Sequence, residues 1–149
     1  MKNSRRLKPV ARFAHQQERT AARQLGDSLR RAEQLQKHLD DLVEYRDQYV
    51  AGFKAAGAQG LSVVKLRDYQ LFLRRLDNAI MQQRHHLLAS RQQCQHSQNE
   101  WYNRHGHSKM IDKVIDNRKQ AESRKRDEQE QREIDDRPTS STDPDRPDH

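Results

Sequence analysis

Apolar residues recur at every seventh position through the first third of the chain, in two interleaved series that match the a and d positions of a coiled coil. The a positions hold Ala11, Glu18, Leu25, Ala32, Leu39, Arg46 and Phe53. The d positions hold Leu7, Ala14, Ala21, Ser28, Leu35, Leu42 and Tyr49. Only Glu18, Ser28 and Arg46 interrupt this stripe. The pattern predicts a helix from about Arg5 to Phe53, roughly 70 Å long at about 1.5 Å per residue.

A second stripe with the same period follows it. Its a positions are Leu66, Leu73, Ile80, Leu87, Cys94, Trp101, Ser108 and Ile115. Its d positions are Tyr69, Leu76, Gln83, Ser90, Ser97, Arg104, Ile111 and Arg118. Beyond Ile115 the register meets only polar residues, but residues 119–137 contain neither Gly nor Pro and are rich in helix formers. The second helix is therefore expected to run from about 62 to 136.

Between the stripes lies a short segment of glycine and alanine, residues 52–60, which is the only stretch that suits a reversal of the chain. The hinge is expected at 54–61, with Ser62 as the N-cap of the second helix. If the turn centres near Ala58, residues whose numbers add up to about 117 face each other. Leu39 would then lie opposite 76–80, and Leu7 opposite the region of Ile111.

The expected fold class is all-α: a long two-helix antiparallel coiled-coil hairpin forming one domain over 1–137. A parallel homodimer would use the same stripes, but the first helix ends where the second stripe loses its apolar residues, and this match favours the hairpin. Residues 138–149 are rich in Pro, Ser, Thr and Asp and are expected to be a disordered tail.

Composition limits the functions that such a chain can have. Of its 149 residues, 32% are hydrophobic and 34% are charged, which is too polar for a globular enzyme core. Disorder is the competing interpretation, and the heptads argue against it up to about Ile115. A two-helix rod has no cavity for a small-molecule substrate, so we expect a protein that acts by contact and is not an enzyme.

Motifs for catalysis or cofactor binding are absent from the sequence. The eight histidines include no pair at i,i+4 spacing, and there is no phosphate-binding loop, nucleophile elbow or Cys/His ligand pattern. We therefore expect no catalytic residue, no metal and no cofactor. The single Cys94 occupies an a position and is interpreted as a small core residue of a protein in a reducing cytoplasm. No apolar run approaches the roughly 18 residues that span a membrane, so membrane contact is expected only through partners.

Three residues widen the apolar stripe beyond what a two-helix seam needs. Tyr45, Phe72 and Ala79 fall at g positions, and the pairing rule places Tyr45 opposite Phe72. Exposed aromatic residues beside a seam are good anchors for a partner. Two other interpretations stay open: the residues shield the seam, or they contact a third helix in a homo-oligomer.

Positive charge gathers at the open end of the hairpin, where the chain begins. We define the basic tip as the residues Lys2, Arg5, Arg6, Lys8, Arg12, Arg104, Lys109, Lys113, Arg118 and Lys119. The chain's formal net charge is +7. Such a tip would be attracted to an acidic protein surface, such as the lining of a ring, or to nucleic-acid phosphates. Charge alone does not choose between these partners.

Two segments beside the hinge resemble the FliJ family of flagellar export proteins. They are the LxxY…Y pattern of 42–49 and the YQxFxxxL…AI pattern of 69–80, and Trp101 follows in place. The resemblance covers about residues 10–130. It implies a fold like the central stalk of rotary ATPases and a role as the soluble stalk of the flagellar type III export apparatus.

The resemblance also implies partners and sites. The open end would insert into the export ATPase ring, where the basic tip would contact it and promote ring assembly and hydrolysis. The cytoplasmic domain of the export gate would bind Leu42, Tyr45, Tyr49, Phe72, Leu76 and Ala79. Chaperones of export substrates would be further partners. The implied location is the cytoplasmic face of the inner membrane at the flagellar basal body, where the protein would serve flagellum assembly and, through it, chemotaxis.

Three alternatives remain beside this interpretation. The stalk of a virulence type III secretion system would have the same architecture. A basic coiled coil that binds nucleic acid would show affinity that falls steeply with salt. A complete rotary-ATPase stalk subunit fits less well, because the chain is too short for the globular part expected between its helices.

Overall fold

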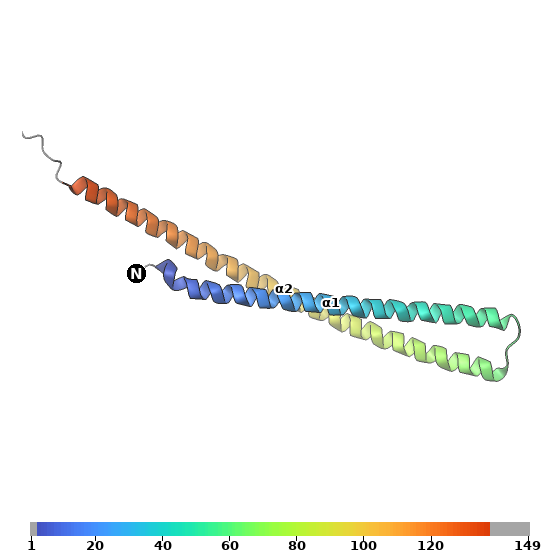
Figure 1. Cartoon of the computed structure of the whole chain (residues 1–149). Coiled ribbons are helices and arrows are strands. Elements are labelled where there is room, and N and C mark those ends of the chain that lie inside the picture. Colours follow the sequence, from blue (N-terminus) through green and yellow to red (C-terminus); the bar gives the residue numbers. More distant parts are fainter. Residues whose placement is uncertain (1–2, 138–149) are drawn as a thin grey trace, which may run out of the picture. The chain divides into compact units, whose positions relative to one another are not determined.

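Two helices make up the described part of the chain, residues 3–137, in the computed structural model (Figure 1). They are α1 (Asn3–Gly57) and α2 (Val63–Asp136), and no strand occurs within that part. The predicted all-α fold with two long helices is therefore confirmed. Lys2 of the basic tip and the tail expected at 138–149 lie outside the described residues.

The helices contribute to two compact units. Unit 1 combines Met1–Gln16 with Gly106–His149, and unit 2 is Gln17–His105. Each unit thus contains a segment of α1 and a segment of α2. Whether residues 1–137 behave as one domain stays a prediction.

The turn between the helices is narrower than expected and lies later in the chain. Helix α1 continues through Gly52 to Gly57, and the backbone N–H groups of Gln59 and Gly60 donate to carbonyls of its last turn, at 3.1 Å each. Gly60 has φ +88°, in the left-handed region where a residue with a Cβ is strained. Ser62 Oγ accepts from the backbone N–H of Lys65 at 3.2 Å, which confirms Ser62 as the N-cap of α2.

The core of unit 2 is a cluster of Leu39, Ile80 and Leu87, against which Leu35 and Leu42 pack, together with Val43. Leu39 was expected opposite 76–80, so the inclusion of Leu87 indicates a shift of the pairing along α2. Three polar pairs across the seam agree: Arg46–Asp77, Ser28–Ser97 and Arg91–Gln36. Their residue numbers add up to 123–127 instead of about 117. The chain turns at 58–62, which moves the expected sum to about 120 and so accounts for part of this shift.

The core of unit 1 is smaller. Ala11 and Ala14 of α1 pack with Ile111 and Ile115 of α2, and Leu7 covers this cluster. Leu7 therefore lies near Ile111, as expected. Alanine at two successive core positions allows the backbones to approach closely, so this core contains little apolar volume and depends on the two isoleucines.

Burial follows the predicted stripes with three exceptions. Every a and d position of the first stripe is buried or half-buried, whereas Leu66, Arg104 and Arg118 of the second are exposed. Near Arg104 the half-buried position is His105 instead. A straight α-helix drifts by about 20° per heptad relative to an exact seven-residue repeat, so the buried line moves to the neighbouring position over a long helix.

No helix within residues 3–137 is long and apolar enough to cross a membrane.

Candidate binding surfaces

Five aromatic rings from both helices form a continuous series beside the turn in unit 2. We call it the aromatic ladder, and it consists of Tyr45, Tyr49, Phe53, Tyr69 and Phe72. Tyr45 meets Phe72 edge to face at 6.3 Å between ring centroids, which confirms that these two residues lie opposite each other. Phe72 contacts Tyr49 at 4.6 Å, Tyr49 stacks on Tyr69 at 5.4 Å, and Tyr69 stacks on Phe53 at 3.5 Å. Ring contacts of this kind add to the stability gained from burial.

The six residues assigned to gate binding by resemblance differ in what they present to solvent. Tyr45 is 50% exposed, whereas Leu76 is only 8% exposed and belongs to the seam. The remaining four, Leu42, Tyr49, Phe72 and Ala79, are half-buried. Tyr45 is therefore the most accessible residue of the set, and Leu76, which is buried in the seam, offers little surface to a partner. That any of them binds a partner stays a prediction.

Sequence reasoning missed the part that Phe53 and Tyr69 play in this surface. Both were assigned to ordinary core positions. The signal was present, because three of the five aromatic residues, Tyr49, Phe53 and Tyr69, lie at a or d positions close to the hinge, where antiparallel helices must bring them together. Exposed apolar residues at the start of α2, among them Val63, Val64 and Leu71, add to the apolar surface of this end of unit 2.

Arg46 explains how the seam tolerates a charge at an a position. Its guanidinium Nε donates to Asp77 Oδ1 at 2.5 Å, at the edge of the seam. The hydrogen bond that Arg46 donates to Asp77, followed by the negative charge of that carboxylate, raises the pKa of Arg46 above its already high ordinary value. The aliphatic stem can stay in the seam while the charged head remains at its edge.

The middle of the unit 2 seam is polar and small. Ser28 Oγ and Ser97 Oγ are hydrogen-bonded at 3.0 Å, and Cys94 Sγ donates to the backbone carbonyl of Ser28 at 3.1 Å. Cys94 is half-buried, in keeping with its expected place in the seam. Because serines fill little space, a shallow groove of about 630 Å³ opens beside Ser28, Ser90 and Ser97. Unit 2 thus has a groove that the heptad pattern did not predict.

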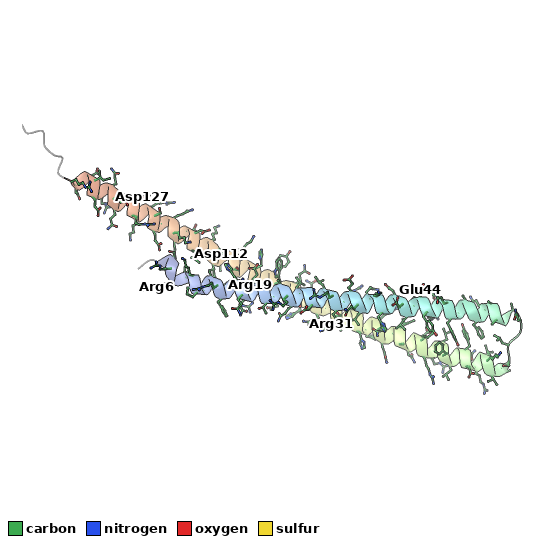
Figure 2. All side chains as sticks on the ribbon, viewed as in Figure 1. Arg6, Arg19, Arg31, Glu44, Asp112 and Asp127 are labelled. Atoms are coloured by element: carbon green, nitrogen blue, oxygen red, sulfur yellow. The ribbon has the colours of Figure 1, made fainter. Side chains whose placement is uncertain are left out.

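Eight of the predicted basic-tip residues lie in the described part of unit 1, and all eight are exposed. Arg104 falls in unit 2 and so is not grouped with them. Figure 2 shows the charged side chains along both helices, with Arg6 and Asp112 labelled in unit 1. The positive character of the tip is a property of sequence and exposure; its partner stays a prediction.

A cleft of about 300 Å³ within the tip is organised by a carboxylate that sequence reasoning did not single out. The cleft is lined by Ser4, Arg5, Lys8, Lys119, Glu122 and Arg126. Ser4 donates to the Glu122 carboxylate twice, from its backbone N–H at 3.1 Å and from its Oγ at 2.8 Å. Glu122 and Arg126 were missed because the stripe was taken to end at Ile115, although Glu122 occupies the next a position.

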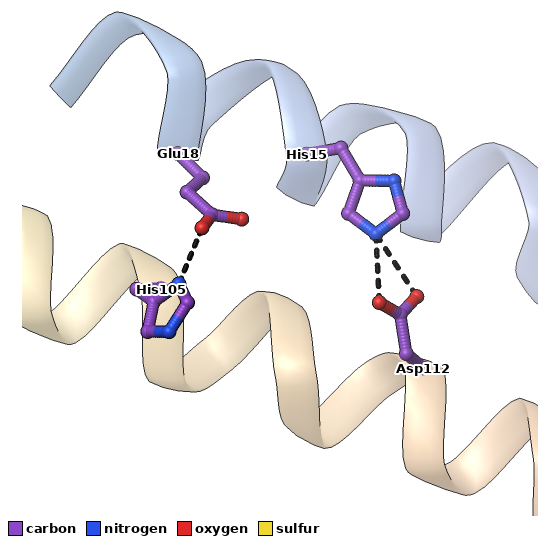
Figure 3. A network of polar contacts seen from close by, with 4 residues as sticks. All are labelled: His15, Glu18, His105 and Asp112. Atoms are coloured by element: carbon purple, nitrogen blue, oxygen red, sulfur yellow. Dashed lines mark hydrogen bonds and ion pairs between the residues drawn. The ribbon is translucent and has the colours of Figure 1, made fainter. Parts of the chain in front are cut away.

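Two histidine–carboxylate pairs join the helices, one in each unit (Figure 3). In unit 1, His15 Nε2 lies 2.9 and 3.0 Å from the two carboxylate oxygens of Asp112. In unit 2, His105 Nδ1 bonds to Glu18, and the His105 ring stacks on Trp101 at 4.9 Å. The His15–Asp112 pair flanks the apolar core of unit 1, whereas Glu18 occupies an a position of the first stripe. Over the part of the chain that the structure describes, no group of three His, Cys, Asp or Glu residues could hold a metal ion.

The fold and these surfaces define a two-helix coiled-coil protein whose distinctive features are the aromatic ladder and the exposed basic residues of unit 1. The chain belongs to the flagellar FliJ protein family, whose model, described as "Flagellar FliJ protein", matches residues 2–140. The resemblance drawn from 42–49 and 69–80 is thereby confirmed, and the protein is related to flagellar type III export. No curated protein matches the chain. No solved structure matches it either, so the likeness to a rotary-ATPase stalk stays a prediction.

Proposed function

We propose that this chain is the non-enzymatic stalk of a flagellar type III export apparatus. Its basic tip enters the export ATPase ring and promotes ring assembly and ATP hydrolysis, while its aromatic ladder binds the cytoplasmic domain of the export gate. The protein thereby couples the ring to the gate. Membership of the family supports a role in flagellar export, and the aromatic ladder is the observation on which the proposal mainly rests.

The aromatic ladder supports a binding role for one reason above others. A two-helix coil gains nothing by leaving half of Tyr45 in water at a g position, beside Phe72 at another g position. Aromatic residues dominate the energetics of protein interfaces, where a few anchors supply most of the affinity. The ladder holds Tyr45 against a ring that is itself packed, so a partner would meet a preformed surface.

The basic tip supports an acidic partner. Residues 3–16 and 106–126 hold eleven Lys and Arg against three Asp and Glu. A concentration of charge of this kind accelerates encounter with a complementary surface and makes binding sensitive to salt. An acidic ring pore is the partner that family membership favours.

Two further elements rest on the family alone. They are the escort of chaperones that carry export substrates, and a peripheral location at the inner membrane, reached through partner proteins. Both follow from placing the chain in the export apparatus.

The decisive experiment measures ATP hydrolysis and ring assembly by the cognate export ATPase with and without the purified chain, at moderate salt. The expected result is faster hydrolysis together with assembly of the ATPase into rings. If the ATPase neither responds nor co-purifies, the stalk proposal is wrong. Binding to nucleic acid, with an affinity that collapses as salt rises, would then support the basic coiled-coil alternative.

A further inference from the structure

Unit 1 carries exposed apolar side chains that neither its core nor its basic tip explains. Four of them form what we call the apolar strip: Val10 and Phe13 on α1, Met110 and Val114 on α2. Their exposed fractions are 46%, 61%, 58% and 37%. Leaving four such side chains in water on a narrow two-helix unit is unfavourable unless something covers them.

The four residues lie on one flank because each immediately precedes a core residue. Val10 and Phe13 come before Ala11 and Ala14, and Met110 and Val114 come before Ile111 and Ile115; the later member of each pair is buried. In an antiparallel pair of helices, the residues that immediately precede a seam position lie on the same side of the seam, whichever helix they belong to. Tyr45 and Phe72 in unit 2 stand in this relation to the seam and contact each other.

Contacts on the other flank support this placement. His15 and Asp112 each follow a core residue, and they pair with each other across the seam at 2.9 Å. The flank with the apolar strip is therefore the one opposite this pair. Val10 lies within about one turn of the level of Val114, and Phe13 within about one turn of Met110, since their residue numbers add up to 124 and 123 and the contacting pairs of unit 1 add up to 126 and 127.

Charge is divided between the two flanks. Within 3–16 and 106–126, the helical positions around the strip hold three charged residues, all basic: Arg6, Lys113 and Arg124. All three acidic residues of these segments, Asp112, Asp116 and Glu122, occupy the seam or the opposite flank. Within these two segments, the charged positions that border the strip are thus all basic.

We infer that the apolar strip is the seat of a third helix, an acidic amphipathic helix supplied by a partner protein. A helix laid along the flank would place apolar residues at i, i+3 or i+4, and i+7 against side chains from both α1 and α2. Acidic residues beside that stripe would meet the basic border. The inference goes beyond the proposed stalk function, because the four apolar residues are not part of the basic tip, although Arg6 and Lys113 of the border belong to it.

Two other occupants fit less well. A second copy of the chain would bring two basic borders together, so charge opposes self-association through the strip. A flat bilayer would have to desolvate the polar residues that adjoin the strip, Gln16, His107 and Asn117 among them. A single helix can avoid both penalties, because it is narrow enough to cover the strip alone.

The test uses the full chain and a synthetic helix of about five turns, with a leucine stripe and glutamate on its other faces. A counterpart carries lysine in place of every glutamate. Fluorescence anisotropy of the labelled peptides should show at least about tenfold tighter binding of the acidic one, an effect that rising salt reduces. Phe13→Ser combined with Met110→Ser should weaken that binding at least about tenfold.

The matched control is Met81→Ser combined with Tyr102→Ser, two apolar residues of unit 2 with similar exposure. It should bind the acidic helix like the unaltered chain, and circular dichroism should give all variants equal helix content. Equal binding of both peptides, or no loss in the strip variant, overturns the inference. So does sedimentation of a dimer that Phe13→Ser with Met110→Ser dissociates, or strip-dependent binding to vesicles of phosphatidylcholine and phosphatidylglycerol without peptide binding.

Discussion

Replacing Tyr45 and replacing Phe72 should have different effects, although the two side chains contact each other. Tyr45 touches the ladder only through its edge contact with Phe72 and is half exposed, whereas Phe72 also packs on Tyr49. Truncating Tyr45 therefore removes surface offered to a partner, and truncating Phe72 removes that surface together with its internal support.

We expect Tyr45→Ala to leave the stability of the hairpin within about 0.5 kcal/mol of the unaltered chain. It should weaken binding to the cytoplasmic domain of the export gate by about 1–3 kcal/mol, as for an aromatic anchor. Isothermal titration calorimetry and urea unfolding measure the two quantities. Tyr102→Ala is the control, because Tyr102 is an exposed tyrosine of unit 2 that lies outside the ladder. Equal binding by the two variants would show that the ladder does not bind the gate.

The serine pair in the seam gives a second prediction at this scale. Ser28→Ala leaves the hydroxyl of buried Ser97 without its partner and should destabilise unit 2 by about 1 kcal/mol. The double variant Ser28→Ala with Ser97→Ala loses both hydroxyls and gains helix propensity, so it should return close to the original stability. Urea unfolding of the two single variants and the double variant measures the coupling. Additive losses would mean that the hydrogen bond contributes nothing.

At the scale of the helices, the junction at Ser62 determines where α2 begins. The first turn of α2 contains no acidic residue, so the N-cap hydrogen bond from Lys65 N–H to Ser62 Oγ is the main side-chain support of that end. Ser62→Ala should therefore lower the free energy of unfolding by about 1 kcal/mol. Ser62→Asp keeps the acceptor and adds a charge that the helix dipole favours, so it should be at least as stable as serine. Thermal unfolding that ranks aspartate with alanine would contradict this account.

The helices were largely predictable from the sequence because a seven-residue repeat of apolar residues fixes the buried face. Ser62 was recognisable as the N-cap, since serine is a preferred residue immediately before the first position of a helical stripe. The exact pairing was not predictable. Gly52 suggested an early turn, but a single glycine costs a long helix only about 1 kcal/mol, and α1 continues past it to Gly57. The polar pairs of unit 2 are accordingly shifted along α2, whereas Tyr45 still faces Phe72 as expected.

Arg104 illustrates the second limit on sequence reasoning at this scale. A strict heptad count places it in the seam, yet His105 takes the half-buried position and bonds to Glu18. The drift of the buried line is too small to change which residue is buried over three heptads, but over seven heptads it moves burial to the neighbouring position. The aromatic ladder was half predictable, because Tyr45 and Phe72 stood out at g positions. The Ser4–Glu122 contact was not, since it joins residues 118 positions apart beyond the apolar stripe.

For the whole molecule, the placement of charge should matter more than its total. The chain carries a formal net charge of +7, and unit 1 concentrates basic residues around its core and its cleft. A polycation binds any acidic surface weakly, whereas a stalk tip must present its charges where the ring receives them. Two variants with equal net charge but different charge positions separate these cases.

We expect the tip variant with Arg5, Lys8, Arg12 and Lys119 all changed to Gln to lose stimulation of the export ATPase, with affinity reduced at least about tenfold. The control changes Arg19, Arg23, Lys37 and Arg84 of unit 2 to Gln, and both variants have a formal net charge of +3. Only the control should retain stimulation of the ATPase. That stimulation should still decline between low and moderate salt, because salt screens the charges that face the ring. Equal loss in both variants would mean that the chain attracts the ATPase through its total charge, and a tip seated in the pore would then be the wrong description.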